Sequence, residues 1–351
     1  MRILVFGAGP LGSLLAARLF QGGRHVTLLA RSQPLVDLER YGVCLRNFQS
    51  GVEEAIRVPL VETFTSADRY DLVIVVMRKN SALKILSQLA DNKKVKHYLF
   101  LMNNAAGPGR VITSLGAKRV LMGFPGMAGF RQGHRIIYLA AQPDKPANII
   151  IGRNTSISEK EYLAITKTIE KGHYLNVTME PNMDAWSKYH VALLFPALAP
   201  ALYLCDNDHL RMSRTRDAIV LTWRGIKEGC RVLRTLGYPV RPLYIKYFLW
   251  LPEPVMVVLL ARLMRNPRME VAMARHAAVI RDEIQQLNQE FRELINESGL
   301  FTPTIDFLMD QFSQKAPLLP DGSHSMRLRW SELLVPTLLL ILLVLVLIYL
   351  L

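Results

Sequence analysis

The amino-acid sequence predicts an α/β domain, an all-α domain after it and a single C-terminal transmembrane helix. Three observations carry this prediction: alternating strand and helix patterns in the first half, helical periodicity in the second, and a charge-free apolar run at the end. We therefore expect an α/β domain at residues 1–180, a helical domain at 181–314, a linker at 315–332 and a membrane anchor at 333–351.

Composition narrows the classes of protein that this chain can be. Half of its 351 residues are apolar, which excludes a disordered chain. The 43 Lys and Arg residues outnumber 29 Asp and Glu, so the partners should be anionic: a phosphate-bearing cofactor, acidic lipid or nucleic acid. Cys44, Cys205 and Cys230 are too few and too widely spaced for a disulfide framework or a zinc site, so we expect a reducing compartment and no metal.

The N-terminus carries a dinucleotide-binding fingerprint. An apolar run at residues 2–6 reads as a buried parallel strand, and a helix pattern and a second strand at 25–30 complete a βαβ unit. Glycines between strand and helix permit a tight turn and close approach of a pyrophosphate to the helix N-terminus. The expected cofactor-binding residues of this Rossmann-type turn are Gly7, Gly9, Pro10, Leu11 and Gly12. The dinucleotide that this fingerprint predicts is itself an anionic partner. We therefore do not expect nucleic acid among the partners of this protein.

Arg31 indicates which dinucleotide binds. It follows the second strand, where an NAD-specific site usually places Asp or Glu for the ribose hydroxyls. An arginine there favours the 2′-phosphate of NADP, so NADPH is the expected cofactor. The alternative is a solvated arginine after a strand.

Two further buried strands are predicted at residues 71–77 and 97–102. Each ends in polar residues, beginning with Arg78 and Asn103 respectively, and ligands of open α/β sheets bind at such carboxyl ends. These loops should therefore face the cofactor. Alternating residues around 135–140 and 147–151 predict a closing hairpin.

The second half is predicted to be helical. Ser158 and Glu161 have capping-box spacing at the start of one helix, and few strand signals follow residue 179. Two apolar stretches, 191–204 and 249–260, are interrupted by prolines and too short for membrane spans, so we expect core or dimer packing there. A homodimer is therefore an open expectation. Residues 181–281 carry 15 basic and seven acidic residues, which either lie against anionic lipid or form a solvated face.

The last 19 residues, 333–351, contain no charge. As a helix they would span about 28 Å, close to the thickness of a bilayer core. Arg327, Arg329 and Trp330 flank the segment, which predicts a single-pass membrane protein with its enzyme domain in the cytoplasm. The alternatives are a buried helix, or a lipid-anchor signal at 321–323 that would need a secretory leader.

The fingerprint at residue 7, Arg31, the strand ending in Asn103 and the sequence Trp186-Ser-Lys188 together resemble the ketopantoate reductase family over about residues 1–314. The resemblance implies an enzyme that reduces a 2-oxo acid with NADPH. It implies further that Lys188 is the general acid and that Glu283, followed by Asn288, contacts the substrate hydroxyl. By the same resemblance, Asn103 lies near the nicotinamide, and Arg78 replaces a family lysine beside the cofactor.

Other positions depart from the family pattern. Ala192 and Pro196 replace two asparagines after the lysine, and Val271 replaces a serine that holds the substrate carboxylate. The expected function is therefore an NADPH-dependent reductase of a carbonyl compound that need not be ketopantoate. The alternative is a non-catalytic NADPH-binding regulatory or interaction protein. Candidates for replacement polar contacts are His190, Arg275 and His276.

Overall fold

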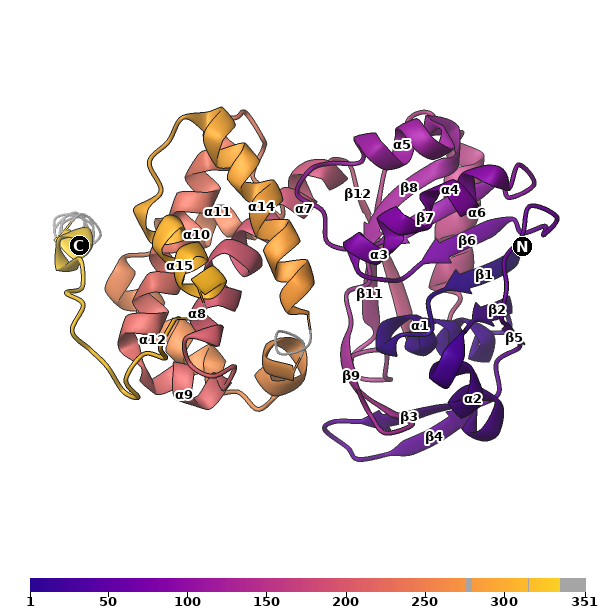
Figure 1. Cartoon of the computed structure of the whole chain (residues 1–351), viewed down its shortest axis with the longest axis horizontal. Coiled ribbons are helices and arrows are strands. Elements are labelled where there is room, and N and C mark those ends of the chain that lie inside the picture. The colour runs from indigo at the N-terminus through magenta and orange to yellow at the C-terminus, as the bar shows by residue number, and fades with distance from the viewer. Residues whose placement is uncertain (276–279, 315, 335–351) are drawn as a thin grey trace, which may run out of the picture. The chain divides into compact units, whose positions relative to one another are not determined.

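A computed structural model describes residues 1–275, 280–314 and 316–334 (Figure 1). The chain forms two compact units. The first contains Met1–Val191 together with Val271–Phe291, and the second contains Ala192–Glu270 and the described residues from Arg292 onward. A segment distant in sequence, 271–291, thus belongs to the N-terminal unit, whereas the division expected from sequence runs at residue 180.

The N-terminal unit is built on an eight-stranded sheet of order β12-β11-β8-β7-β6-β1-β2-β5, parallel except where β8 meets β11. The chain leaves β1 for β2 on one side and later returns to β6 on the other, which places a topological switch point at the end of β1. The strands of this sheet are β1 (Arg2–Phe6), β2 (His25–Leu29), β5 (Leu60–Val61), β6 (Leu72–Val75), β7 (His97–Leu101), β8 (Val120–Phe124), β11 (Ala147–Gly152) and β12 (Leu175–Glu180).

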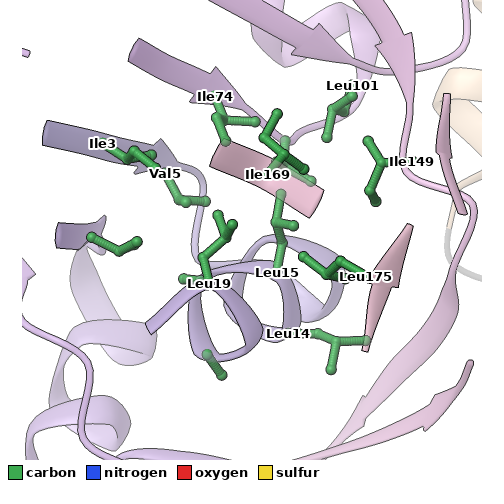
Figure 2. Close-up of a cluster of buried hydrophobic side chains, with 14 of the residues drawn as sticks. Ile3, Val5, Leu14, Leu15, Leu19, Ile74, Leu101, Ile149, Ile169 and Leu175 are labelled. Carbon is green, nitrogen blue, oxygen red and sulfur yellow. The ribbon is translucent and has the colours of Figure 1, made fainter. Parts of the chain in front are cut away.

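Helices cover both faces of this sheet. Figure 2 shows one face, where Leu14, Leu15 and Leu19 of α1 and Ile169 of α6 pack against Ile3 and Val5 of β1. The alternate β1 residues, Leu4 and Phe6, point to the other face and pack with α4 and α5. The helices of this unit are α1 (Pro10–Gln21), α2 (Ser32–Tyr41), α3 (Lys79–Lys84), α4 (Leu86–Asp91), α5 (Gly109–Leu115), α6 (Glu159–Glu170) and α7 (Met183–Leu193), with a short turn η1 (Ala117–Arg119).

The expected hairpin of residues 135–140 with 147–151 is wrong, although both strands exist. β10 (Arg135–Leu139) pairs with β9 (Ala128–Gln132) and with β3 (Val43–Asn47), which also pairs with β4 (Glu53–Ile56), in a separate four-stranded sheet. β11 instead joins the large sheet beside β8 and β12. Alternation predicted the strands but carries no information about distant partners, and the tight turn with Gly133 at φ +58° joins β9 to β10.

The second unit is helical, as expected. Its long helix α10 packs against α8, α9, α12 and α15 (Figure 1). Its elements are η2 (Leu194–Leu198), α8 (Ala199–Tyr203), α9 (His209–Arg214), α10 (Arg216–Thr235), α11 (Tyr244–Trp250), α12 (Glu253–Met264), α15 (Pro303–Gln314) and η4 (Trp330–Leu333). Three elements extend across the division of the chain: α7, η3 (Glu270–Ala274) and α14 (Arg281–Ser298).

The expected linker covers residues 315–332, and its described part, 316–332, is hydrogen-bonded along the helical unit. Arg214 forms a bidentate pair with Asp321 at 2.7 Å, and Asp217 accepts bonds from Ser325 and Met326. This segment therefore contributes to the helical unit rather than hanging free from it.

Within the described residues, no helix is both long and apolar enough to cross a bilayer. The anchor expected at 333–351 falls, apart from its first two residues, outside the described residues.

Candidate active site

The glycine-rich turn between β1 and α1 has the tight geometry that the fingerprint predicts. Gly7 has φ +122°, and a Cβ there would lie 2.5 Å from the carbonyl oxygen of Val76 at the end of β6. A Cβ on Gly12 would lie 1.9 Å from the Gly7 carbonyl oxygen. Both positions therefore require glycine, and they bring the turn against the switch point of the sheet.

The same turn leaves room for a ligand. A Cβ added to Gly9 would meet no described atom within 4 Å, and Pro10 and Leu11 open α1 directly behind it. No side chain caps this helix end, and its first turn contains no acidic residue. Open space beside free backbone N–H groups at a helix N-terminus suits a pyrophosphate, so this turn fits a dinucleotide.

Arg31 lies at the N-cap of α2, immediately after β2. Its guanidinium stacks over the ring of Phe6, 5.8 Å from the ring centroid, and its Nε donates to the Glu62 carbonyl at 3.2 Å. These contacts hold the Arg31 side chain beside β1, the strand that precedes the glycine-rich turn, and leave it exposed. That position is compatible with an anionic ligand group.

Asn103 and Glu283 lie together, although 180 residues separate them. Asn103 follows β7, and its Nδ2 donates to Oε1 of Glu283 on α14 at 3.4 Å. Burial raises the pKa of Glu283, while the Asn103 bond and the nearby Arg78 charge oppose the rise. Two buried amide oxygens, Oδ1 of Asn103 and Oδ1 of Asn288, have no hydrogen-bond partner in the part of the chain that the structure describes. These two amide oxygens can therefore still accept a hydrogen bond from a further donor.

Lys79, the residue after Arg78, forms a buried ion pair that sequence reasoning missed. Lys79 Nζ lies 2.6 Å from Oε2 of Glu290 on α14 and 2.5 Å from Oδ1 of Asn104. Burial lowers the pKa of Lys79, and the Glu290 charge opposes the shift. Glu290 also accepts from the backbone N–H groups of Ala105 and Ala106, at 3.3 and 3.2 Å. This network holds the loop after β7 against α14.

Lys188 is brought to the other side of the same loop. It lies on α7, only 3% exposed, and its Nζ pairs with the Asp184 carboxylate one turn earlier. A Cβ on Gly107 would come within 3.4 Å of the Lys188 Nζ and 3.1 Å of the Asp184 Oδ1. Gly107 has φ +80°, so glycine here permits both the loop conformation and its approach to the lysine.

Arg78 lies at the start of α3 and pairs with Asp282 at 2.9 Å, and Asn80 donates to the same carboxylate at 2.7 Å. Burial tends to raise the pKa of Asp282, but these bonds lower it. Arg78 is partly exposed, and Asp282 is the immediate neighbour of Glu283. The pair therefore fixes the first turn of α14 beside the end of β6.

The residues that depart from the family pattern offer no equivalent polar groups. Val271 is 1% exposed, and both Ala192 and Pro196 are buried. The His190 ring contacts the rings of both Trp186 and Phe124, and its desolvation there lowers its pKa to about 4. Arg275 lies over Phe130, 5.7 Å from the ring centroid, while His276 falls outside the described residues.

The structure thus brings Asn103, Lys188 and Glu283 together at the loop after β7, which contacts α3, α7 and α14. Arg31 lies apart from this cluster, at the end of β2. Sequence reasoning missed two carboxylates of the site, although their spacing on a helix indicated them. Asp184 precedes Lys188 by four residues, and Glu290 follows Glu283 by two turns. The Lys79–Glu290 pair had none, because 211 residues separate its members.

Among the residues that the structure describes, no group of His, Cys, Asp and Glu side chains is arranged to hold a metal ion.

The fold is similar to that of several solved enzymes. A D-mandelate dehydrogenase in complex with NADH and anilino(oxo)acetate is 17% identical, with a TM-score of 0.71, covering 90% of this chain and 98% of the other. A PanE/ApbA family ketopantoate reductase from Ralstonia eutropha JMP134 is 18% identical, with a TM-score of 0.70 and the same coverage. A dimeric ketopantoate reductase from Staphylococcus aureus is 13% identical, with a TM-score of 0.65 over 90% of this chain and 98% of its own.

At these identities the likeness shows the fold: a Rossmann-like α/β domain with a helical domain after it. No curated protein sequence matches the chain. A family model does match the N-terminal region, which holds the glycine-rich turn, Arg31, Arg78 and Asn103. Residues 3–154 match the family of ketopantoate reductase PanE/ApbA.

Proposed function

We propose that this chain is an NADPH-dependent reductase of a 2-oxo acid or a related ketone. One observation carries the proposal: the loop after β7 meets Glu283 through Asn103 and approaches Lys188 through Gly107. Three groups that the resemblance assigns to substrate and cofactor are thereby gathered at the carboxyl end of the sheet, beside a turn that fits a dinucleotide. Such ends are where ligands of open α/β sheets bind.

NADPH, when bound, supplies the hydride. Lys188 then acts as the general acid: its ammonium hydrogen-bonds the ketone oxygen and gives up a proton as negative charge develops there. The Asp184 carboxylate, one helical turn before the lysine, holds the ammonium in place before reaction. Because the lysine is almost fully buried, its charge acts on the carbonyl with little screening by water.

Glu283 and Asn103 position the substrate. Burial favours the protonated carboxyl of Glu283, which can donate to or accept from a substrate hydroxyl. Asn103 orients that carboxyl through its Nδ2 and has its own Oδ1 available for a donor. This assignment gives both residues a binding role and leaves proton transfer to the lysine.

The substrate need not be ketopantoate. The buried Val271 has no hydroxyl with which to hold a carboxylate. We infer that the substrate carries a more apolar group where this valine replaces the serine of the family that the chain resembles. A panel of aliphatic and aromatic 2-oxo acids, ketopantoate included, should therefore contain a substrate on which the protein oxidises NADPH. Failure across such a panel, with NADPH binding intact, would favour the non-catalytic alternative.

We also propose that residues 333–351 anchor the protein in a membrane, with its enzyme domain in the cytoplasm. The support is the length and apolar character of this segment and the basic residues and tryptophan before it. In the full chain, Leu343→Arg with Leu345→Arg should shift the protein from the membrane to the soluble fraction, because each central arginine costs about 2.5–3.5 kcal/mol of insertion.

The matched control places the same charges on apolar residues that are already exposed, Leu210→Arg with Leu318→Arg. That double variant should stay with the membrane. Equal partitioning of both double variants would refute the anchor. A homodimer, as in the Staphylococcus aureus reductase, remains our expectation for the oligomeric state.

A further inference from the structure

A second site lies within the helical unit, in a pocket of about 600 Å³ beside α10. This volume is typical of small-molecule sites. Arg224, Lys227, Arg231 and Arg234 recur every three or four residues along one face of α10, and all four line the pocket. Arg329, from the segment after α15, adds a fifth cation.

Carboxylates compensate only part of this charge. The buried Glu253 forms a bidentate pair with Arg224 at 2.9 and 2.7 Å, and Glu332 pairs with Lys227 at 2.9 Å. Arg329 lies 3.9 Å from Glu253 and 4.0 Å from Glu332, so it shares these same two carboxylates.

The third carboxylate, Glu228, is engaged elsewhere. It accepts from the backbone N–H groups of Thr304 and Ile305 and from the Thr304 hydroxyl, and so caps the start of α15. Five cations therefore face three carboxylates, and one of the three is bound to a helix end.

The surplus lies at Arg231 and Arg234, both exposed. Arg231 donates to the Phe301 carbonyl at 2.9 Å, which fixes its guanidinium without neutralising it. The guanidinium of Arg234 makes no hydrogen bond or ion pair with any residue in the described ranges 1–275, 280–314 and 316–334. Two adjacent guanidinium groups without a matching carboxylate suit an anion that carries two charges.

Apolar side chains complete the wall. Leu249 of α11, Leu300 and Phe301 line the pocket, and Phe301 is 77% exposed. Burial raises the pKa of the lining thiol of Cys230 to about 12, so this cysteine stays protonated and is no nucleophile. The pocket therefore has the character of a binding site rather than a reactive one.

We propose that this pocket binds a phosphate monoester attached to an apolar group, with Arg231 and Arg234 contacting the phosphate. Such a ligand exists in two forms with the same chemistry, a soluble phosphorylated compound and an anionic lipid headgroup. The site is separate from the proposed reductase site, because all of its lining residues belong to the helical unit.

Calorimetric titration of the full chain in detergent with phenyl phosphate tests the site. Arg231→Gln with Arg234→Gln should weaken binding about tenfold or more, since two charge-assisted bonds are lost. The control, Arg262→Gln with Arg265→Gln, removes the same charge from α12 and its end, outside the pocket, and should leave the affinity within about twofold. Because all four residues are exposed, thermal unfolding should confirm that both double variants fold.

A second arm identifies the source of the phosphate. The full chain is placed in phosphatidylcholine vesicles containing either phosphatidic acid or, at equal charge, phosphatidylserine. If phenyl phosphate binds more weakly in the vesicles with phosphatidic acid but not in those with phosphatidylserine, the natural ligand is a lipid headgroup. If it binds equally in the two kinds of vesicle, the natural ligand is a soluble compound. Absence of phenyl phosphate binding, or an equal loss in the two arginine pairs, would overturn the proposal.

Discussion

The two basic clusters of this protein differ in how their charge is balanced. In the N-terminal unit each of three cations has its own carboxylate: Lys79 with Glu290, Lys188 with Asp184, and Arg78 with Asp282. In the pocket of the helical unit, Arg224, Lys227 and Arg329 share two carboxylates, whereas Arg231 and Arg234 pair with no carboxylate of the described residues. Paired buried charges are held in fixed positions, as proton transfer requires, whereas surplus exposed charge is available to an anion from outside.

Breaking a buried pair should have the largest effect on stability. Lys79→Met leaves Glu290 buried without its cation and should lower the free energy of unfolding by about 3–5 kcal/mol. Urea denaturation checks this value. The control is Arg214→Gln, which breaks the exposed pair with Asp321 and should cost at most about 1 kcal/mol. Similar losses in the two variants would mean that the Lys79 pair is not a structural support of the site.

Loss of the proposed general acid should come next. Lys188→Ala should lower kcat by about 10²-fold, equivalent to about 2.7 kcal/mol, and leave NADPH affinity nearly intact. Steady-state kinetics and fluorescence titration of NADPH measure the two quantities separately. A parallel fall in NADPH affinity would assign Lys188 to the cofactor instead of the carbonyl.

Arg31 provides a test at the cofactor end of the same unit. NADPH should bind more tightly than NADH, and Arg31→Ala should remove about 1–3 kcal/mol of that preference by loss of a charge-assisted contact to the 2′-phosphate. Calorimetry with both nucleotides checks the difference. Equal affinities in the unaltered protein would reject the role of Arg31.

Glu283 makes the stability of the site dependent on pH. Its pKa in the fold is raised above the ordinary value of 4.5, so the native state binds more protons than the unfolded state between these two values. Stability should therefore fall as pH rises through that window, relative to Glu283→Gln, which does not titrate. Unfolding free energies of both proteins at about pH 4 and about pH 7 measure this. A relative gain at the higher pH would contradict the direction.

The surplus cations should have the smallest effect on stability. Arg231→Gln with Arg234→Gln removes two like charges that lack a matching carboxylate. The free energy of unfolding should therefore change by less than about 0.5 kcal/mol. Any change should be a gain in stability. The gain should be greatest at low salt, because repulsion between the positive charges of the pocket is least screened there. A loss that persists at low salt would indicate that these arginines support the fold and are not held for a ligand.

The sequence predicted what depends on local pattern. The residues of β1, the glycine turn and α1 were all evident, because a buried strand, two close backbone approaches and a proline at a helix start each leave a signature in consecutive residues. The Ser158 cap of α6 is confirmed for the same reason, since its Oγ accepts from the Glu161 backbone N–H.

What the sequence could not predict depends on distant partners. The sequence predicts both β10 and β11 as strands, but it pairs them with each other. In the structure, β10 lies between β9 and β3, and β11 lies between β8 and β12. Proline and glycine indicate a linker at 315–332, yet bonds from its described residues to Asp217, Arg214 and Glu253 tie it to helices 76 to 108 residues earlier in the chain. Lys188 and Glu283 were identified only by resemblance, since each also fits a surface helix.

The central claim is that hydride passes from NADPH to a 2-oxo acid under the control of Lys188. NADPH carrying deuterium at the transferred position of C4 tests it directly, with mass spectrometry of the hydroxy acid formed by the full chain. We expect one deuterium on the carbon beside the carboxylate with the unaltered protein, and about 10²-fold slower labelling with Lys188→Ala. Labelling at the same rate by both proteins, or a product without deuterium, would contradict the account.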